Sequence, residues 1–138
     1  GRERCIEAGL EGRIEFLAHG VEQLDSVDAY DLALIPQPFL PPAAFKRGIE
    51  AVLDALRPGG WLLVLALDLS EADPLVSASR RVRARLWGGG AVSADDLSRD
   101  LGRAGYESVR ADPPVGGYRM FAARRPLPVA AEPALRTV

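Results

Sequence analysis

A run of seven apolar residues at positions 61–67, WLLVLAL, constrains the fold more than any other feature. A strand without alternating polar residues has no side suited to water, so helices must cover it on both faces. The segment before it predicts a helix, because its apolar residues recur at helical spacing. Those residues are Phe45, Ile49, Val52, Leu53 and Leu56. The triplet PGG at 58–60 ends that helix and turns the chain into the strand.

The other segments add further strands and helices. Residues 13–18 (RIEFLA) alternate and predict a strand, and the apolar stretch 30–35 (YDLALI) predicts a second, buried strand. Two helices follow residue 67, and the second begins at Ser93, an N-cap with Asp96 three residues on. The Gly triplet at 88–90 between them reads as a flexible turn. Strands at 106–111 and 118–124, joined by a short connection, predict an antiparallel hairpin.

Strands that alternate with helices favour an α/β layered sheet, parallel in its first part and with helices on both faces. The length of 138 residues fits one domain, which we place at 1–126, followed by a Pro-containing tail at 127–138. The chain opens without Met and inside a short helix, so we expect it to be part of a larger domain.

Composition excludes several classes of function. A net charge of −2 gives no electrostatic reason to expect nucleic-acid binding. The single cysteine, Cys5, rules out an internal disulfide and a Cys-rich metal site, and we expect no metal. No apolar run approaches the roughly 18 residues of a membrane span, and no signal peptide is visible. We therefore expect a cytoplasmic protein in a reducing compartment.

Five segments, taken in order, resemble the class I S-adenosylmethionine-dependent methyltransferases. RIEFLAHGVEQL resembles the third strand and adenine loop of that family, AYDLALIPQPFLP its fourth strand, and LRPGGWLLV the junction before its fifth. SADDLSRDLGRAGYESVRA and YRMFAARRP resemble its last helix and its sixth and seventh strands. The resemblance covers roughly residues 1–126 and implies a Rossmann-like, incomplete sheet of strands three to seven.

The glycine-rich cofactor loop of the family and the acidic residue after its second strand have no counterpart here. No Gly-x-Gly turn follows a strand and opens a helix, since Gly88, Gly89 and Gly90 come after a helix. The resemblance implies part of a transferase that uses S-adenosylmethionine on a small molecule and is not competent alone. The alternative is a non-catalytic assembly module that a partner chain completes. A homodimer or an N-terminal segment would complete the sheet, whereas a dehydrogenase is disfavoured by the absent dinucleotide fingerprint.

The resemblance implies two groups of cofactor-binding residues. His19, Gly20 and Val21 fall at the adenine loop, where Gly20 takes the position of the usual acidic residue. Ile35, Pro36 and Gln37 follow the fourth strand, at an edge where ligands of α/β sheets collect. An ordinary polar loop is the alternative at 19–21. His19, the only histidine, is also a candidate general base, although a solvated loop histidine is the commoner case.

Three residues are candidates for the substrate side: Phe39, Asp68 and Trp87. Phe39 and Trp87 could equally fill core, and Asp68 could instead cap the turn after its strand. The arginines between 80 and 85 would suit an anionic substrate, but a solvated helix face explains them as well. No catalytic residue is assigned, because methyl transfer from an activated sulfonium depends mostly on in-line positioning.

Overall fold

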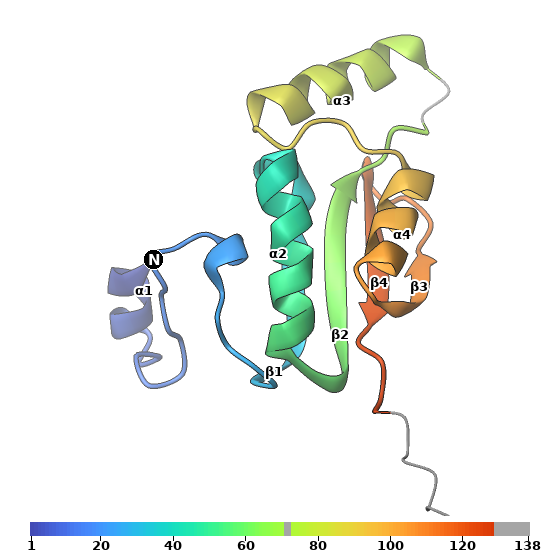
Figure 1. Cartoon of the computed structure of the whole chain (residues 1–138). Helices are drawn as coiled ribbons and strands as arrows, with labels where there is room; N and C mark the ends of the chain where they lie inside the picture. Colours follow the sequence, from blue (N-terminus) through green and yellow to red (C-terminus); the bar gives the residue numbers. More distant parts are fainter. Residues whose placement is uncertain (71–72, 129–138) are drawn as a thin grey trace, which may run out of the picture.

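The computed structural model describes residues 1–70 and 73–128 and shows a four-stranded sheet in the order β1-β2-β4-β3 (Figure 1). The elements are α1 (Arg2–Glu7), η1 (Val21–Gln23), β1 (Tyr30–Pro36), η2 (Gln37–Phe39), α2 (Pro42–Ala55), β2 (Leu56–Leu67), α3 (Pro74–Leu86), α4 (Ala94–Arg103), β3 (Glu107–Ala111) and β4 (Tyr118–Arg124). Residues 129–138 of the expected tail lie outside the described residues. No helix in the described ranges is long and apolar enough to cross a bilayer.

The pairing of the strands confirms the predicted α/β class. β1 and β2 are parallel, with Ile35 opposite Val64, as a strand–helix–strand unit requires. β4 runs antiparallel to β2, with Phe121 opposite Val64, and β3 pairs antiparallel with β4. The predicted C-terminal hairpin therefore forms the antiparallel side of a mixed sheet. β2 begins at Leu56, so the PGG triplet lies within the strand rather than before it.

The hydrophobic core lies on one face of this sheet, under α2 and α4 (Figure 1). Leu62 and Val64 point to this face from β2 and are fully buried against Ile49 of α2 and Leu101 of α4. The Tyr106 hydroxyl donates a 2.8 Å hydrogen bond to the Ile49 carbonyl oxygen. Burial raises the pKa of Tyr106, so the phenol remains a neutral donor that links the start of the hairpin to α2.

The opposite face of the sheet corrects two predictions. The helices packed on the sheet, α2 and α4, lie on the same side, so the expected helices on both faces are not present in the described part of the chain. Leu32 and Leu34 of β1 are 58% and 60% exposed, so the stretch 30–35 is a strand but not a buried one. On β2, Trp61 is half-buried beneath the guanidinium groups of Arg110 and Arg124. We call Leu32, Leu34, Trp61, Leu63 and Leu65 the open face.

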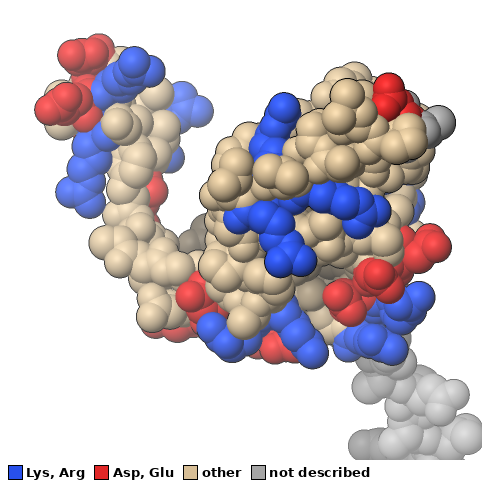
Figure 2. Space-filling view, turned by 90° about the horizontal axis from the view of Figure 1, so that it is seen from above, with Lys and Arg blue, Asp and Glu red and all other residues tan. Residues whose placement is uncertain are grey.

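The strand predicted at 13–18 is also wrong. These residues form turns and irregular backbone in an N-terminal arm that projects from the sheet (Figures 1 and 2). Ile14, Phe16 and Leu17 remain 40–49% exposed. A strand exists only where a neighbour accepts and donates its backbone hydrogen bonds, and no strand of the described sheet adjoins this segment. The short N-terminal helix, in contrast, is confirmed as α1.

Candidate functional site

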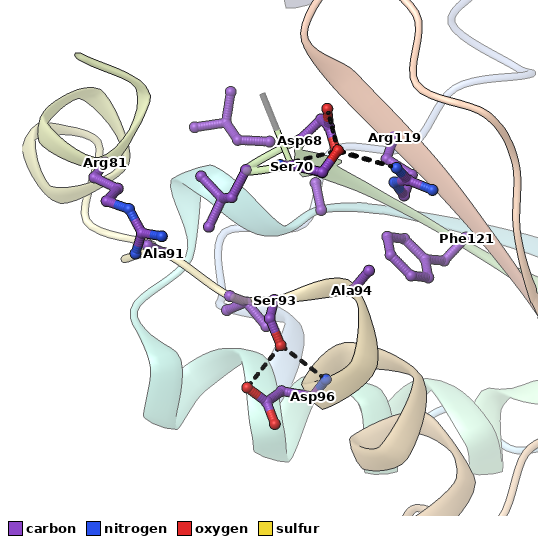
Figure 3. Close-up of a pocket in the computed structure, with 13 residues that line it drawn as sticks. Asp68, Ser70, Arg81, Ala91, Ser93, Ala94, Asp96, Arg119 and Phe121 are labelled. Carbon is purple, nitrogen blue, oxygen red and sulfur yellow. Dashed lines mark hydrogen bonds and ion pairs between the residues drawn. The ribbon is translucent and has the colours of Figure 1, made fainter. Parts of the chain in front are cut away.

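A cavity of about 350 Å³ lies at the carboxyl end of β2. Its walls come from the end of β2 and residues 69–70, from Arg81 of α3, from residues 91–93 and the start of α4, and from β4 (Figure 3). In α/β sheets this is the edge where ligands bind. The described residues contain no group of His, Cys, Asp or Glu side chains placed to hold a metal ion.

Asp68 is the buried acidic residue of this cavity, only 7% exposed. Its Oδ1 accepts a 2.8 Å hydrogen bond from the Ser70 hydroxyl and lies 3.2 Å from Nη2 of Arg119. Arg80 of α3 donates to the Asp68 carbonyl oxygen at 2.9 Å, and its guanidinium lies 3.8 Å from the carboxylate. Asp68 therefore ties together the end of β2, α3 and β4.

These contacts determine the charge state of Asp68. Burial acts to raise the pKa of the carboxyl group, but hydrogen bonds from Ser70 and Arg119, with the positive charge of Arg119, outweigh it and lower the pKa below its ordinary value. Asp68 is therefore ionised at neutral pH and is a poor proton acceptor. Its geometry suits positioning of neighbouring groups rather than general-base catalysis.

Two guanidinium groups face the cavity from different elements, Arg81 from α3 and Arg119 from β4 (Figure 3). Arg119 is held by Asp68, yet its Nε is buried and has no hydrogen-bond partner among the described residues. Asp96, the other acidic residue of the wall, accepts from the Ser93 hydroxyl at 2.7 Å and from Arg99 at 2.6 Å. The Ser93 hydrogen bond and then Arg99 lower the pKa of Asp96, so this carboxylate is already satisfied.

Phe39 and Trp87, two of the predicted substrate residues, are brought together. Their ring centroids are 4.9 Å apart, and the Arg83 guanidinium lies 5.7 Å from the Trp87 ring centre. Phe39 ends η2 and Trp87 follows α3, so this contact joins the loop after β1 to the helix after β2. Neither ring lines the cavity that contains Asp68.

The Gly triplet is fixed in place rather than a flexible turn. Gln37 is 2% exposed, and its Nε2 donates to the Gly89 carbonyl oxygen at 2.9 Å. The Gly89 amide in turn donates to the Pro38 carbonyl oxygen at 3.0 Å. A Cβ at Gly89 would lie 2.4 Å from the backbone oxygens of Gln37 and Pro38, so the contact requires glycine. The Gln37 side-chain nitrogen is thus occupied by its hydrogen bond to the loop at 88–90.

The remaining predicted cofactor residues lie in two places. His19 is exposed and its Nδ1 lies 3.0 Å from the Gly20 carbonyl oxygen, while Val21 packs on Gly48 of α2. Ile35 is buried in the core and Pro36 ends β1. No hydrogen bond or ring contact in the described ranges links residues 19–21 to residues 35–37. Their binding roles remain predictions.

Sequence reasoning missed Ser70 and Arg119 and did not single out Arg81. Arg119 meets Asp68 across 51 residues, which no local pattern signals. Arg81 is one of four arginines in the same helical segment, and the sequence does not indicate which of them faces the sheet. The only usable signal was the position of Asp68 at the end of a buried strand, which marked the right edge of the sheet.

Comparisons with known proteins agree with this fold. No family model and no curated protein matches the sequence. Among solved structures, an O-methyltransferase family protein from Burkholderia thailandensis matches 93% of this chain at a TM-score of 0.74 and 18% identity. The S-adenosylmethionine-dependent methyltransferase SibL matches 91% at 0.69 and 25% identity. The cyclase SpnF matches 91% at 0.66 and 20% identity.

These matches show that the chain has the fold of part of a methyltransferase domain. It spans 40% of the Burkholderia protein, 39% of SibL and 61% of SpnF, so each of those chains contains structure that this one does not. The presence of a cyclase among the matches shows that this fold serves more than one reaction.

Proposed function

We propose that the chain is part of an S-adenosylmethionine-dependent methyltransferase that acts on a small molecule. The carrying observation is that a methyltransferase structure covers 93% of the chain at a TM-score of 0.74, and SibL, at 25% identity, is described as S-adenosylmethionine-dependent. The cavity beyond β2 lies at the ligand-binding edge of such a sheet.

In this proposal the bound cofactor supplies a methyl group already activated on a sulfonium. The residues proposed to hold it are His19, Gly20, Val21, Ile35, Pro36 and Gln37. Asp68 is proposed to flank the substrate from the cavity wall, and Phe39 and Trp87, which form an aromatic pair outside that cavity, to contact a part of the substrate that extends beyond it. Their contribution is orientation of an oxygen, nitrogen or carbon nucleophile in line with the methyl group, which accounts for much of the barrier in such reactions.

The open face supports a second proposal, that the chain is an assembly module completed by other polypeptide. β1 is an edge strand of the described sheet, and Leu32 and Leu34 beside that edge are more than half exposed. An apolar strand with a free edge is a site for pairing. A second copy, a partner chain or an N-terminal segment would complete the sheet, and the glycine-rich cofactor loop would come with that segment. We propose a cytoplasmic location for the assembled protein.

Calorimetric titration of S-adenosylhomocysteine tests the first proposal. We would titrate this chain and a chain extended upstream by roughly 50–80 residues, the length of two strand–helix units. Binding to the extended chain, weakened several-fold by His19→Ala and unchanged by Asp25→Ala at another exposed position of the same loop, supports a methyltransferase. Binding to neither chain refutes the cofactor assignment and favours the assembly module.

A further inference from the structure

We propose that the cavity beyond β2, which Arg81 and Arg119 both line, binds a small organic anion whose carboxylate contacts Arg81. The binding site follows from the cavity alone. Only the statement that the bound anion is the substrate rests on the methyltransferase proposed above. The cavity beyond β2 is thereby assigned a class of ligand, small carboxylates.

The charges around the cavity favour an anion. Among the described residues, its walls carry two arginines, Arg81 and Arg119, and two aspartates, Asp68 and Asp96. Each aspartate already has an arginine partner outside the lining, Arg80 in one case and Arg99 in the other. Among the described lining residues the charges balance, and because both carboxylates are already paired, the charge left without a partner there is that of Arg81. A cationic ligand would have to displace an existing ion pair.

Arg81 differs from the other arginines of α3. Figure 2 shows basic side chains gathered on the face seen from above, where α3 lies. Arg80 binds Asp68, Arg83 lies over the Trp87 ring, and Arg85 lines a separate hollow beside the Gly triplet. Arg81 lines the cavity and has no ion pair with a described residue, so its charge is available to a ligand. The solvated-face explanation fits Arg85 better than Arg81.

Arg119 supplies a second, independent argument. Its Nη2 is engaged with Asp68, whereas its Nε is buried without an acceptor among the described residues. The Nε has less than 1 Å² of accessible surface, so a ligand in the cavity would meet the part of this side chain that is exposed, about 20% of it. Because Asp68 holds this guanidinium in place, Arg119 contributes a fixed positive charge to the cavity wall.

The remaining wall selects an organic anion over inorganic phosphate. Phe121 forms one side, and Ala66 and Val92 contribute further apolar surface. A volume of about 350 Å³ lies at the small end of ligand pockets, which suits a single ring or a short chain rather than a dinucleotide. An aromatic carboxylate could place its ring against the apolar Phe121 and direct its charged group toward Arg81.

The test is calorimetric titration of this chain with benzoate, and with benzamide as a neutral probe of the same shape. We expect benzoate to bind and benzamide to bind at least tenfold more weakly. Arg81→Gln should weaken benzoate binding about tenfold, the effect of one charge-assisted contact of about 1.4 kcal/mol. Arg85→Gln removes the same charge from the same helix outside the cavity and should leave the affinity within twofold.

Three outcomes overturn the proposal: no binding of benzoate, equal binding of benzamide, or equal weakening by Arg81→Gln and Arg85→Gln. Inorganic phosphate binding as tightly as benzoate would refute the organic-anion assignment. Because no cofactor is present in these titrations, their failure leaves the S-adenosylhomocysteine result untouched. A benzoate site in a chain that never binds S-adenosylhomocysteine, even when extended, would retain the anion site and refute the methyltransferase.

Discussion

Replacing Asp68 by Asn tests the central ion cluster most directly. The substitution keeps the shape of the side chain and an oxygen that can accept from Ser70, but it removes the negative charge that faces Arg119 and Arg80. Asp68 is 7% exposed, and the two arginine side chains are 20% and 16% exposed. Water therefore cannot readily replace the lost partner, and we expect a substantial loss of stability.

The distances set the size of that loss. A charge pair 3.2 Å apart interacts by about 5 kcal/mol at an effective dielectric constant of about 20, before desolvation is counted. The desolvation cost offsets part of this attraction, and Asn retains some of the hydrogen bonding. Removing one partner of a buried pair typically costs about 3–5 kcal/mol, so we expect Asp68→Asn to lower the free energy of unfolding by about 2–4 kcal/mol at pH 7.

Urea denaturation of both proteins at several pH values is the assay. Because the folded pKa of Asp68 is lowered, its stabilising effect is complete above the unfolded pKa of about 3.9 and is lost as the pH falls through the folded pKa. The difference between the two proteins should therefore be constant from pH 8 to pH 5 and shrink below pH 4. Asp31→Asn, in an exposed pair with Arg57, serves as control and should change stability by less than about 0.5 kcal/mol. A pH-independent difference, or one no larger than that of the control, would refute the reasoning.

Three further substitutions check other parts of the structure. Gly89→Ala should cost about 1–3 kcal/mol in urea denaturation, because its Cβ would lie 2.4 Å from backbone oxygens of η2. Tyr106→Phe should cost about 0.5–1.5 kcal/mol in the same assay through loss of the hydrogen bond to Ile49, and an unchanged midpoint would contradict that role. Leu34→Lys on the open face should leave stability within about 0.5 kcal/mol but reduce self-association in sedimentation velocity. Unchanged self-association would contradict a role of the open face in assembly.

Local patterns predicted most of the fold because the physics of those segments is local. The N-cap at Ser93 formed as expected, with its hydroxyl accepting from the Asp96 amide at 3.1 Å. The helix before β2 and the C-terminal hairpin were likewise confirmed. The failed strand at 13–18 has the right alternation, but no strand of the described sheet lies beside it to pair with. The prediction that residues 30–35 are buried failed for a related reason, because the burial of a strand depends on which helices cover it.

The site was less predictable because its contacts join distant parts of the chain. The sequence indicated Asp68 through its place after a buried strand, but Arg119 comes from a strand 51 residues later. The arginines of α3 are equivalent in sequence, and only the orientation of the helix separates Arg81 from Arg85. Gly89 was predicted to lie in a flexible turn because Gln37, whose amide donates to the Gly89 carbonyl oxygen, lies 52 residues away on another loop.

The two proposed binding regions depend on different parts of the sheet. The anion cavity is built from β2, α3, α4 and β4, and Asp68 and its arginines tie three of these, β2, α3 and β4, together. The proposed cofactor residues lie on the β1 side, next to the free edge and the exposed Leu32 and Leu34. We therefore expect the anion site to form in this chain alone, whereas cofactor binding should require whatever polypeptide covers β1. Benzoate binding without S-adenosylhomocysteine binding in this chain, with both in the extended one, is the pattern that this division of the site predicts.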